Sequence, residues 1–105
     1  MKRPTIHSGE ELDSLAALGR GLALARRRRR LTQATMADRM GVNRQTYMAL
    51  ERNPASVSIG VLLRALGVLG YPARLGALMA QDPIGEKLEE ALGVQRVREP
   101  DVADF

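Results

Sequence analysis

Two side chains that can recognise base edges, Arg44 and Gln45, are adjacent near the middle of the chain. A guanidinium can donate two parallel hydrogen bonds to O6 and N7 of guanine, and a carboxamide can pair with N6 and N7 of adenine. Thr46 and Ala49 follow, and their methyl groups suit the methyl group of thymine. These residues indicate a surface that reads duplex DNA, and the alternative is an ordinary solvated start of a helix.

The surrounding segment, residues 32–52, predicts two short helices joined by a tight turn. Thr32 and Asn43 can each cap a helix by accepting a hydrogen bond from a free backbone N–H group. Gly41 can end the first helix because glycine tolerates a left-handed backbone. The turn is then about three residues long, which is typical of a helix-turn-helix.

Hydrophobic spacing gives both helices a buried face. Met36, Ala37 and Met40 fall one turn apart in the first helix. Tyr47 and Leu50 share the inward face of the second helix, so we expect Tyr47 to pack in the core and not to intercalate between bases. The opposite side of this helix remains open to a partner and carries Arg44, Gln45, Met48, Ala49 and Arg52.

Residues 18–70 resemble the lambda-repressor-like family of helix-turn-helix regulators, often called the Xre family. The matching residues are Arg26, Leu31-Thr32-Gln33, Met36-Ala37, Gly41-Val42, Thr46-Tyr47, Leu50-Glu51-Arg52 and the predicted helix over 58–67. The resemblance implies an all-α, five-helix lambda-repressor-like DNA-binding domain. Arg30 and Asn53 occupy turn positions where the family commonly has glycine. Asparagine visits the left-handed region readily, whereas an arginine there would be strained.

The resemblance also implies roles for several side chains. The second helix of the motif would enter the major groove. Gln33 and Asn43 would bond phosphates, which position the protein but carry little sequence information. Arg26 would form a structural ion pair with Glu51, and a DNA contact is the alternative for this arginine.

Five consecutive arginines, residues 26–30, point all the way round a helix and cannot all touch one phosphate strand. Positively charged side chains stabilise the C-terminal end of a helix whether or not they bind a ligand. For Arg29 and Arg30, beside the next helix, a phosphate contact and a solvated cap are equal alternatives. Arg52 is likewise either a phosphate contact or a plain surface charge.

Composition limits the classes of protein that the chain can belong to. Its 105 residues predict one small domain, and one Phe, two Tyr and no Trp indicate a core built mainly from Leu, Ala, Val and Met. The absence of cysteine excludes disulfides, and with His7 as the single histidine we expect no metal and no cofactor. We expect no enzymatic activity either. His7 has no catalytic partner, and the adjacent carboxylates at Glu10-Glu11 and Glu89-Glu90 would diverge on helices.

Charge is divided unevenly along the chain. Residues 1–52 carry 11 basic and 5 acidic groups, whereas residues 53–105 carry 5 basic and 7 acidic groups. A net charge of +6 in the half with the motif is typical of a protein that binds a polyanion, and the other half, at −2, is expected to face away from DNA. Because no apolar run is long enough to span a membrane and no signal core follows the basic start, we expect a cytoplasmic protein.

The chain divides into a flexible N-terminal tail at residues 1–9, a helix-turn-helix domain at 10–80 and a polar, acidic C-terminal tail at 81–105. A first helix is predicted over 10–30, and Ser58 is expected to cap a fourth. Their apolar faces are assigned to Leu12, Leu15, Leu18, Leu22 and Ala25, and to Ile59, Leu62, Leu63, Leu66 and Leu69. The tail is expected to be mostly disordered, with a short helix at 86–92 as an option.

A short fifth helix is predicted from Pro72, because proline suits the first turn of a helix. It carries Leu75, Leu78 and Met79, which either complete the core or form a dimer seam. Phe105, set among acidic residues, is a candidate contact with another protein. A dimer is expected because so small a domain gains from burying extra surface. Its two recognition helices would read an inverted repeat in double-stranded DNA, with half-sites about 10 base pairs or a multiple apart.

Residues 71–85 are similar to small Xre-type proteins encoded beside HipA-type kinase toxins, in which a leucine-rich helix leads into an Asp-Pro-x-Gly turn. This similarity implies a HipB-like antitoxin that represses its own operon as a homodimer and binds the toxin. The alternatives are a stand-alone transcriptional regulator, and a protein-interaction module whose basic face binds an acidic protein.

Overall fold

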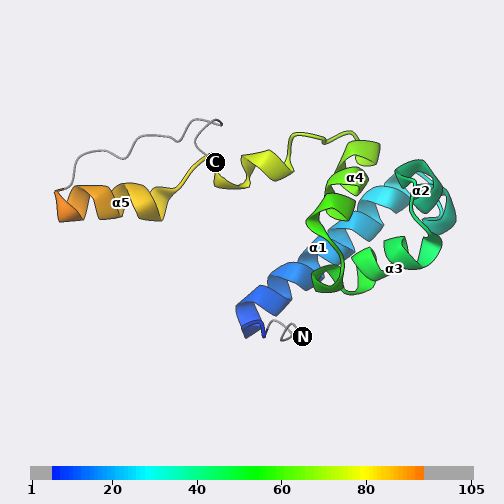
Figure 1. Cartoon of the computed structure of the whole chain (residues 1–105), viewed down its shortest axis with the longest axis horizontal. Coiled ribbons are helices and arrows are strands. Elements are labelled where there is room, and N and C mark those ends of the chain that lie inside the picture. The colour runs from blue at the N-terminus through cyan, green and yellow to red at the C-terminus, as the bar shows by residue number, and fades with distance from the viewer. Residues whose placement is uncertain (1–5, 94–105) are drawn as a thin grey trace. The chain divides into compact units, whose positions relative to one another are not determined.

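A computed structural model describes residues 6–93, which form five α-helices and two short 3-10 turns (Figure 1). The helices are α1 (Gly9–Arg28), α2 (Gln33–Met40), α3 (Arg44–Arg52), α4 (Ile59–Leu69) and α5 (Pro83–Leu92), and the 3-10 turns are Pro54–Ser56 and Leu75–Met79. This part of the chain contains no strand, so the predicted all-α class is confirmed. None of its helices combines the length and the apolar character that crossing a membrane requires.

Side-chain caps explain where the first four helices begin. The backbone N–H of Thr35 donates to Thr32 Oγ1 at 3.0 Å, that of Thr46 donates to Asn43 Oδ1 at 2.8 Å, and that of Val61 donates to Ser58 Oγ at 3.3 Å. The three predicted caps are therefore confirmed. Ser8 caps α1 in a reciprocal pair with Glu11, so residues 8 and 9 belong to the start of this helix and not to a tail.

The ends of α1, α2 and α4 share one backbone geometry. In each, a residue with positive φ follows the helix: Arg30 (φ 55°), Gly41 (φ 71°) and Gly70 (φ 99°). The next N–H group then donates back to a carbonyl five residues earlier. Arg30 adopts this conformation at a cost that the two glycines avoid, as expected. Asn53 has a negative φ of −146°, so this turn does not use the left-handed conformation that asparagine tolerates.

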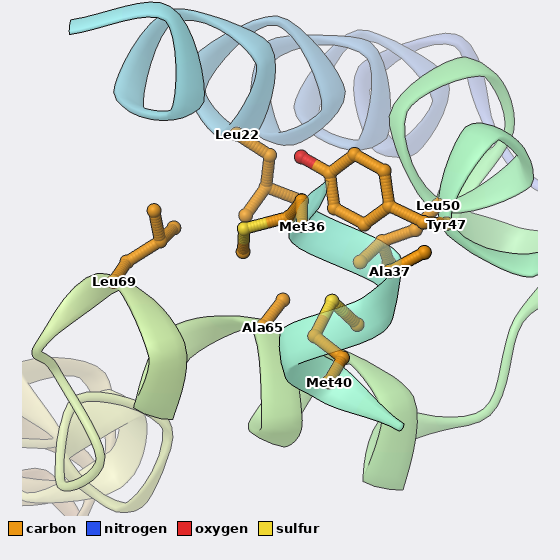
Figure 2. Packing of buried hydrophobic residues seen from close by; sticks show 8 residues of the cluster. All are labelled: Leu22, Met36, Ala37, Met40, Tyr47, Leu50, Ala65 and Leu69. Atoms are coloured by element: carbon orange, nitrogen blue, oxygen red, sulfur yellow. The ribbon is translucent and has the colours of Figure 1, made fainter. Parts of the chain in front are cut away.

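The hydrophobic core joins the first four helices. Figure 2 shows its eight buried side chains: Leu22 from α1, Met36, Ala37 and Met40 from α2, Tyr47 and Leu50 from α3, and Ala65 and Leu69 from α4. The inward faces predicted for α2 and α3 are confirmed. This packing fixes α3 against α2 and α1 and fixes α2 against α4, and it leaves the opposite side of α3 outside the core.

The inward face predicted for α4 is only partly correct. Leu66 and Leu69 are buried, but Ile59 is 69% and Leu63 is 43% exposed. Ala65, which was not predicted, is fully buried. α4 carries apolar residues on nearly every side, so spacing alone does not determine which of them face the core.

The chain divides into two compact units, residues 1–75 and 76–105. The helix predicted from Pro72 is absent; residues Leu75–Met79 form a 3-10 turn in which Leu78 is 70% and Met79 is 74% exposed. The expectation that these two side chains complete the core is therefore wrong.

The short helix allowed at residues 86–92 is present as α5, which begins earlier, at Pro83, with Asp82 as its cap, so the expectation of disorder is wrong for residues Pro83–Leu92. The fifth α-helix thus lies later in the chain than predicted. Phe105 and the rest of residues 94–105 lie outside the described residues.

Candidate nucleic-acid interface

The outward face of α3 presents the side chains predicted to read bases. Arg44, Gln45 and Arg52 are exposed, and Thr46 and Ala49 are half-buried. The opposite face of the same helix is held in the core by Tyr47 and Leu50, which are 0% and 1% exposed. Because α3 is anchored through one side, the orientation of its other side is fixed relative to the domain.

Asn43 and Thr46 form a closed hydrogen-bonded unit at the start of α3. Asn43 Oδ1 accepts from the backbone N–H of Thr46 and from Thr46 Oγ1, both at 2.8 Å. The cap therefore occupies the side-chain oxygen of Asn43 and the hydroxyl proton of Thr46. What remains for a ligand is the NH2 group of Asn43, a hydrogen-bond donor, together with the hydroxyl oxygen of Thr46 as an acceptor and its methyl group.

Two shallow hollows border the outward face of α3. One, of about 410 Å³, lies between α3 and the segment that leads into α4, and the other, of about 240 Å³, lies toward the end of α3. Gln45 and Ala49 line both hollows, so they stand between them. Ser56, Val57 and Ser58 line the first hollow and were not predicted. They lie in the segment between α3 and α4, whose approach to α3 depends on the tertiary fold.

A third hollow, of about 400 Å³, joins α1, α2 and α3 on the other side of the recognition helix. Gln33, Arg20, Arg27, Arg52 and Glu51 line it, so three guanidinium groups and one carboxamide border one depression together with a carboxylate that is paired with Arg26. Such a set of donors suits phosphate oxygens. Arg20 was not predicted as a site residue. Its spacing of seven from Arg27, two helical turns on one face, was the available signal.

The expected pair of Arg26 and Glu51 is present and ties α1 to α3. Arg26 Nε donates to Glu51 Oε2 at 2.7 Å, and Arg26 Nη2 donates to Glu51 Oε1 at 3.3 Å, with each side chain 9% exposed. Arg26 Nη1 also donates to the carbonyl oxygen of Leu31 at 2.9 Å. These bonds give Arg26 a structural role inside the domain.

Gln33 joins the same network, since its Nε2 donates to Glu51 Oε1 at 3.1 Å. The sequence did not predict this contact, which holds the side chain of Gln33 beside α3. Burial alone would raise the pKa of Glu51, but the interactions with Arg26, Tyr47 and Gln33 outweigh it and keep this pKa below its ordinary value. The carboxylate in turn raises the pKa of Arg26. Both groups are therefore charged at neutral pH.

Arg64 supports the turn of the motif and was not predicted from the sequence. Its Nε donates to the carbonyl oxygen of Met40 at 3.1 Å, at the end of α2. A guanidinium at this position satisfies a carbonyl that the helix leaves unpaired and is favoured by the helix dipole. Arg64 thus connects α4 to the turn that orients α3.

Arg29 already has structural partners away from α3. Its Nη1 donates to the carbonyl oxygen of Ala25 at 2.7 Å, and its Nη2 donates to that of Leu69, the last residue of α4, at 2.9 Å. A phosphate contact by Arg29 stays a prediction, and it must use the donors that these bonds leave. Arg30 is exposed, and its contact with phosphate also stays a prediction.

Comparison with known proteins agrees with this geometry. A protein-family model described as helix-turn-helix matches residues 22–75, just over half of the chain. Neither the curated proteins nor the solved structures included a match to this chain. The matched span contains the core, both helices of the motif and every predicted DNA contact. The chain therefore belongs to the helix-turn-helix family of the Xre, or lambda-repressor-like, type, a family of DNA-binding transcription regulators.

Proposed function

We propose that this protein is a sequence-specific transcriptional repressor that inserts α3 into the major groove of its operator. The observation that carries the proposal is the contrast between the two faces of α3. Tyr47 and Leu50 anchor one face in the core, whereas Arg44 and Gln45 are exposed on the other. A rigid helix with a hydrogen-bonding outer face is what base recognition in the major groove requires.

In this proposal each exposed side chain has a separate role. Arg44 pairs with guanine and Gln45 with adenine, while the methyl groups of Thr46 and Ala49 meet thymine. The amide of Asn43 and the donors around the third hollow bind phosphates, and these donors are Gln33, Arg20, Arg27 and Arg52. The base contacts supply sequence preference, and the phosphate contacts supply affinity and register.

The protein acts in the cytoplasm as a homodimer on an inverted repeat, because a two-fold axis presents two copies of α3 to the same face of the duplex. The half-sites are then separated by about 10 base pairs or a multiple of that spacing. A single copy of α3 reads too few bases for tight binding, so a monomer binds weakly.

Selection from a random duplex library at physiological salt tests the proposal. The wild-type protein should enrich an inverted repeat, and the variant with both Arg44→Ala and Gln45→Ala should enrich none. Arg39→Ala is the matched control, since Arg39 is an exposed arginine of α2 that lines none of the three hollows described above. Retention of all duplexes alike by the wild-type protein would contradict sequence-specific reading.

A narrower role, as a HipB-like antitoxin, is favoured by the segment at residues 71–85. Its Asp-Pro-x-Gly turn is built as a helix cap, with the N–H of Gly85 donating to Asp82 Oδ1 at 3.0 Å. In this role the protein would bind a HipA-type kinase toxin and repress the operon that encodes both. Co-expression with the product of the neighbouring gene should then yield one stable complex in size-exclusion chromatography. Separate elution of the two proteins would contradict the antitoxin role and favour a stand-alone regulator.

A further inference from the structure

A second surface of the domain has an apolar character that DNA reading does not use. It is a groove of about 540 Å³ along α1, closed on its other side by the end of α4 and by residues 71–74. Its apolar lining includes Leu18, Gly21, Ala25 and Leu66. None of its lining residues comes from α2 or α3. A ligand in this groove therefore leaves the outward face of α3 available to DNA.

The rim of the groove is positively charged. Arg28, Arg29 and Arg74 line it, and the guanidinium of Arg74 stacks on the ring of Tyr71 at 3.7 Å from the ring centroid. Tyr71 is 40% exposed and forms part of the same lining. An apolar floor with a rim of guanidinium groups suits a ligand that is apolar on one side and acidic overall.

α5, in the other unit, has the complementary character. Ile84, Leu88 and Leu92 recur at intervals of four, so they form one stripe along the helix. Their exposed fractions are 75%, 54% and 70%. A helix of ten residues is marginal in water unless an apolar face is buried against another surface. The stripe therefore requires a partner.

The charge of α5 is opposite to that of the groove. Residues 82–92 contain four carboxylates, Asp82, Glu86, Glu89 and Glu90, against one ammonium group, Lys87. The lengths are also compatible. The groove follows α1 from Ser14 to Arg29, about 22 Å, and the stripe from Ile84 to Leu92 is about 12 Å long.

We propose that α5 of one copy lies in the groove of a second copy, and that the reciprocal contact completes a two-fold dimer. Each contact buries the stripe of Ile84, Leu88 and Leu92 against the apolar floor, with the acidic helix beside the arginine rim. The inference deepens the proposed function, since it names the surfaces that form the repressor dimer. It makes dimer formation independent of Arg44, Gln45 and DNA.

Sedimentation velocity of the full chain without DNA tests this dimer. Leu88→Asp removes the centre of the stripe. Gly21→Leu fills the groove, where a Cβ at residue 21 meets no atom within 4 Å, so the fold itself accepts the larger side chain. Each variant should raise the dimer dissociation constant at least about tenfold, because each disturbs the burial of leucine side chains.

Two matched variants control for general effects. Gly67→Leu adds the same side chain at an exposed helical glycine outside the groove, where nothing lies within 4 Å. Glu90→Ala changes the side of α5 opposite the stripe. Both should associate nearly as well as the wild-type protein. A mixture of the Leu88→Asp and Gly21→Leu variants should associate more tightly than either variant alone but less tightly than the wild-type protein. In such a pair, the intact α5 of the Gly21→Leu copy meets the intact groove of the Leu88→Asp copy.

Several outcomes would overturn the proposal. A monomeric wild-type protein would exclude the exchanged dimer, whatever its affinity for DNA. Dissociation by Leu88→Asp with no effect of Gly21→Leu would mean that α5 contacts a surface of the second copy other than the groove. Should Gly21→Leu fail to fold, Arg28→Glu on the exposed rim tests the same groove. Undiminished association of that variant would contradict the proposal that the arginine rim binds the acidic helix. Because DNA is absent throughout, failure of this proposal is distinct from failure of base reading.

Discussion

Gly19 of α1 lies directly against the backbone carbonyl oxygen of Glu51 in α3, so closely that a Cβ atom at residue 19 would overlap it. Gly19 is buried at this crossing of the two helices. The same residue of α3 carries the carboxylate that pairs with Arg26. The position of the recognition helix thus depends on one close backbone approach and one ion pair, both with α1.

Gly19→Ala should lower the free energy of unfolding by about 1 to 3 kcal/mol, because α1 and α3 must move apart to admit the methyl group. Gly67→Ala is the control, since Gly67 is an exposed helical glycine with nothing within 4 Å of an added Cβ. That substitution should raise stability by about 0.5 to 1 kcal/mol, since alanine is the better helix former. Urea unfolding of both variants measures the difference. Equal effects would show that the crossing is not tightly packed.

Glu51→Gln should lower the free energy of unfolding by roughly 1 to 3 kcal/mol at pH 7, because it leaves the buried Arg26 guanidinium without its charged partner. The pKa of Glu51 is lowered in the folded state. The contribution of the ionised Glu51 to the free energy of unfolding is therefore complete above the pKa of a glutamate in the unfolded chain, about 4.3. It is lost as the pH falls through the lower pKa that Glu51 has in the folded state. Unfolding curves from pH 7 to pH 3 should show the wild-type and variant stabilities converging. A constant gap over that range would rule out the ion pair as its source.

Tyr47→Phe should leave stability unchanged or raise it by up to about 1 kcal/mol. The hydroxyl oxygen of Tyr47 is buried, points toward α1 in Figure 2, and has no hydrogen-bond partner among the described residues. Burial and the nearby carboxylate of Glu51 raise the pKa of Tyr47, so the group stays neutral. Thermal unfolding of this variant, with exposed Tyr71→Phe beside it, provides the measurement. A clear loss of stability would reveal that the hydroxyl makes a stabilising bond.

Arg27→Ala should weaken binding to all DNA sequences alike and reduce the slope of log K against log salt by about 1, as expected for the loss of one phosphate contact. Arg29→Ala should mainly lower stability, because its guanidinium joins the carbonyl oxygens of Ala25 and Leu69. Fluorescence anisotropy at several salt concentrations compares the two variants. An unchanged slope for Arg27→Ala would contradict its phosphate contact, whereas a reduced slope for Arg29→Ala would show that its remaining donors also bind phosphate.

The sequence predicted best those features that depend on neighbouring residues. Thr32, Asn43 and Ser58 cap their helices as expected, because a cap needs only a side-chain oxygen and an N–H group three residues later. The inward faces of α2 and α3 followed from a clear division between apolar and polar sides. Gly41 ended α2 for an equally local reason, its left-handed backbone.

Features that depend on distant contacts were harder to predict. α4 is apolar nearly all round, so its pattern did not distinguish buried Ala65 from exposed Ile59. The apolar residues after Pro72 suggested a helix, but that segment forms a 3-10 turn and the next helix begins at Pro83. The approach of Arg20 and Gln33 to α3 is likewise a product of helix packing, which spacing along the chain does not specify.

The most direct test of the central claim compares Gln45→Ala with the wild-type protein on two duplexes, the selected operator and a scrambled sequence, at one fixed salt concentration. The variant should lose roughly 1 to 3 kcal/mol of binding free energy on the operator, with relaxed preference at one base pair per half-site, and should bind the scrambled duplex as the wild-type protein does. An equal loss on both duplexes would show that Gln45 contributes no base reading and would contradict the proposed role of α3.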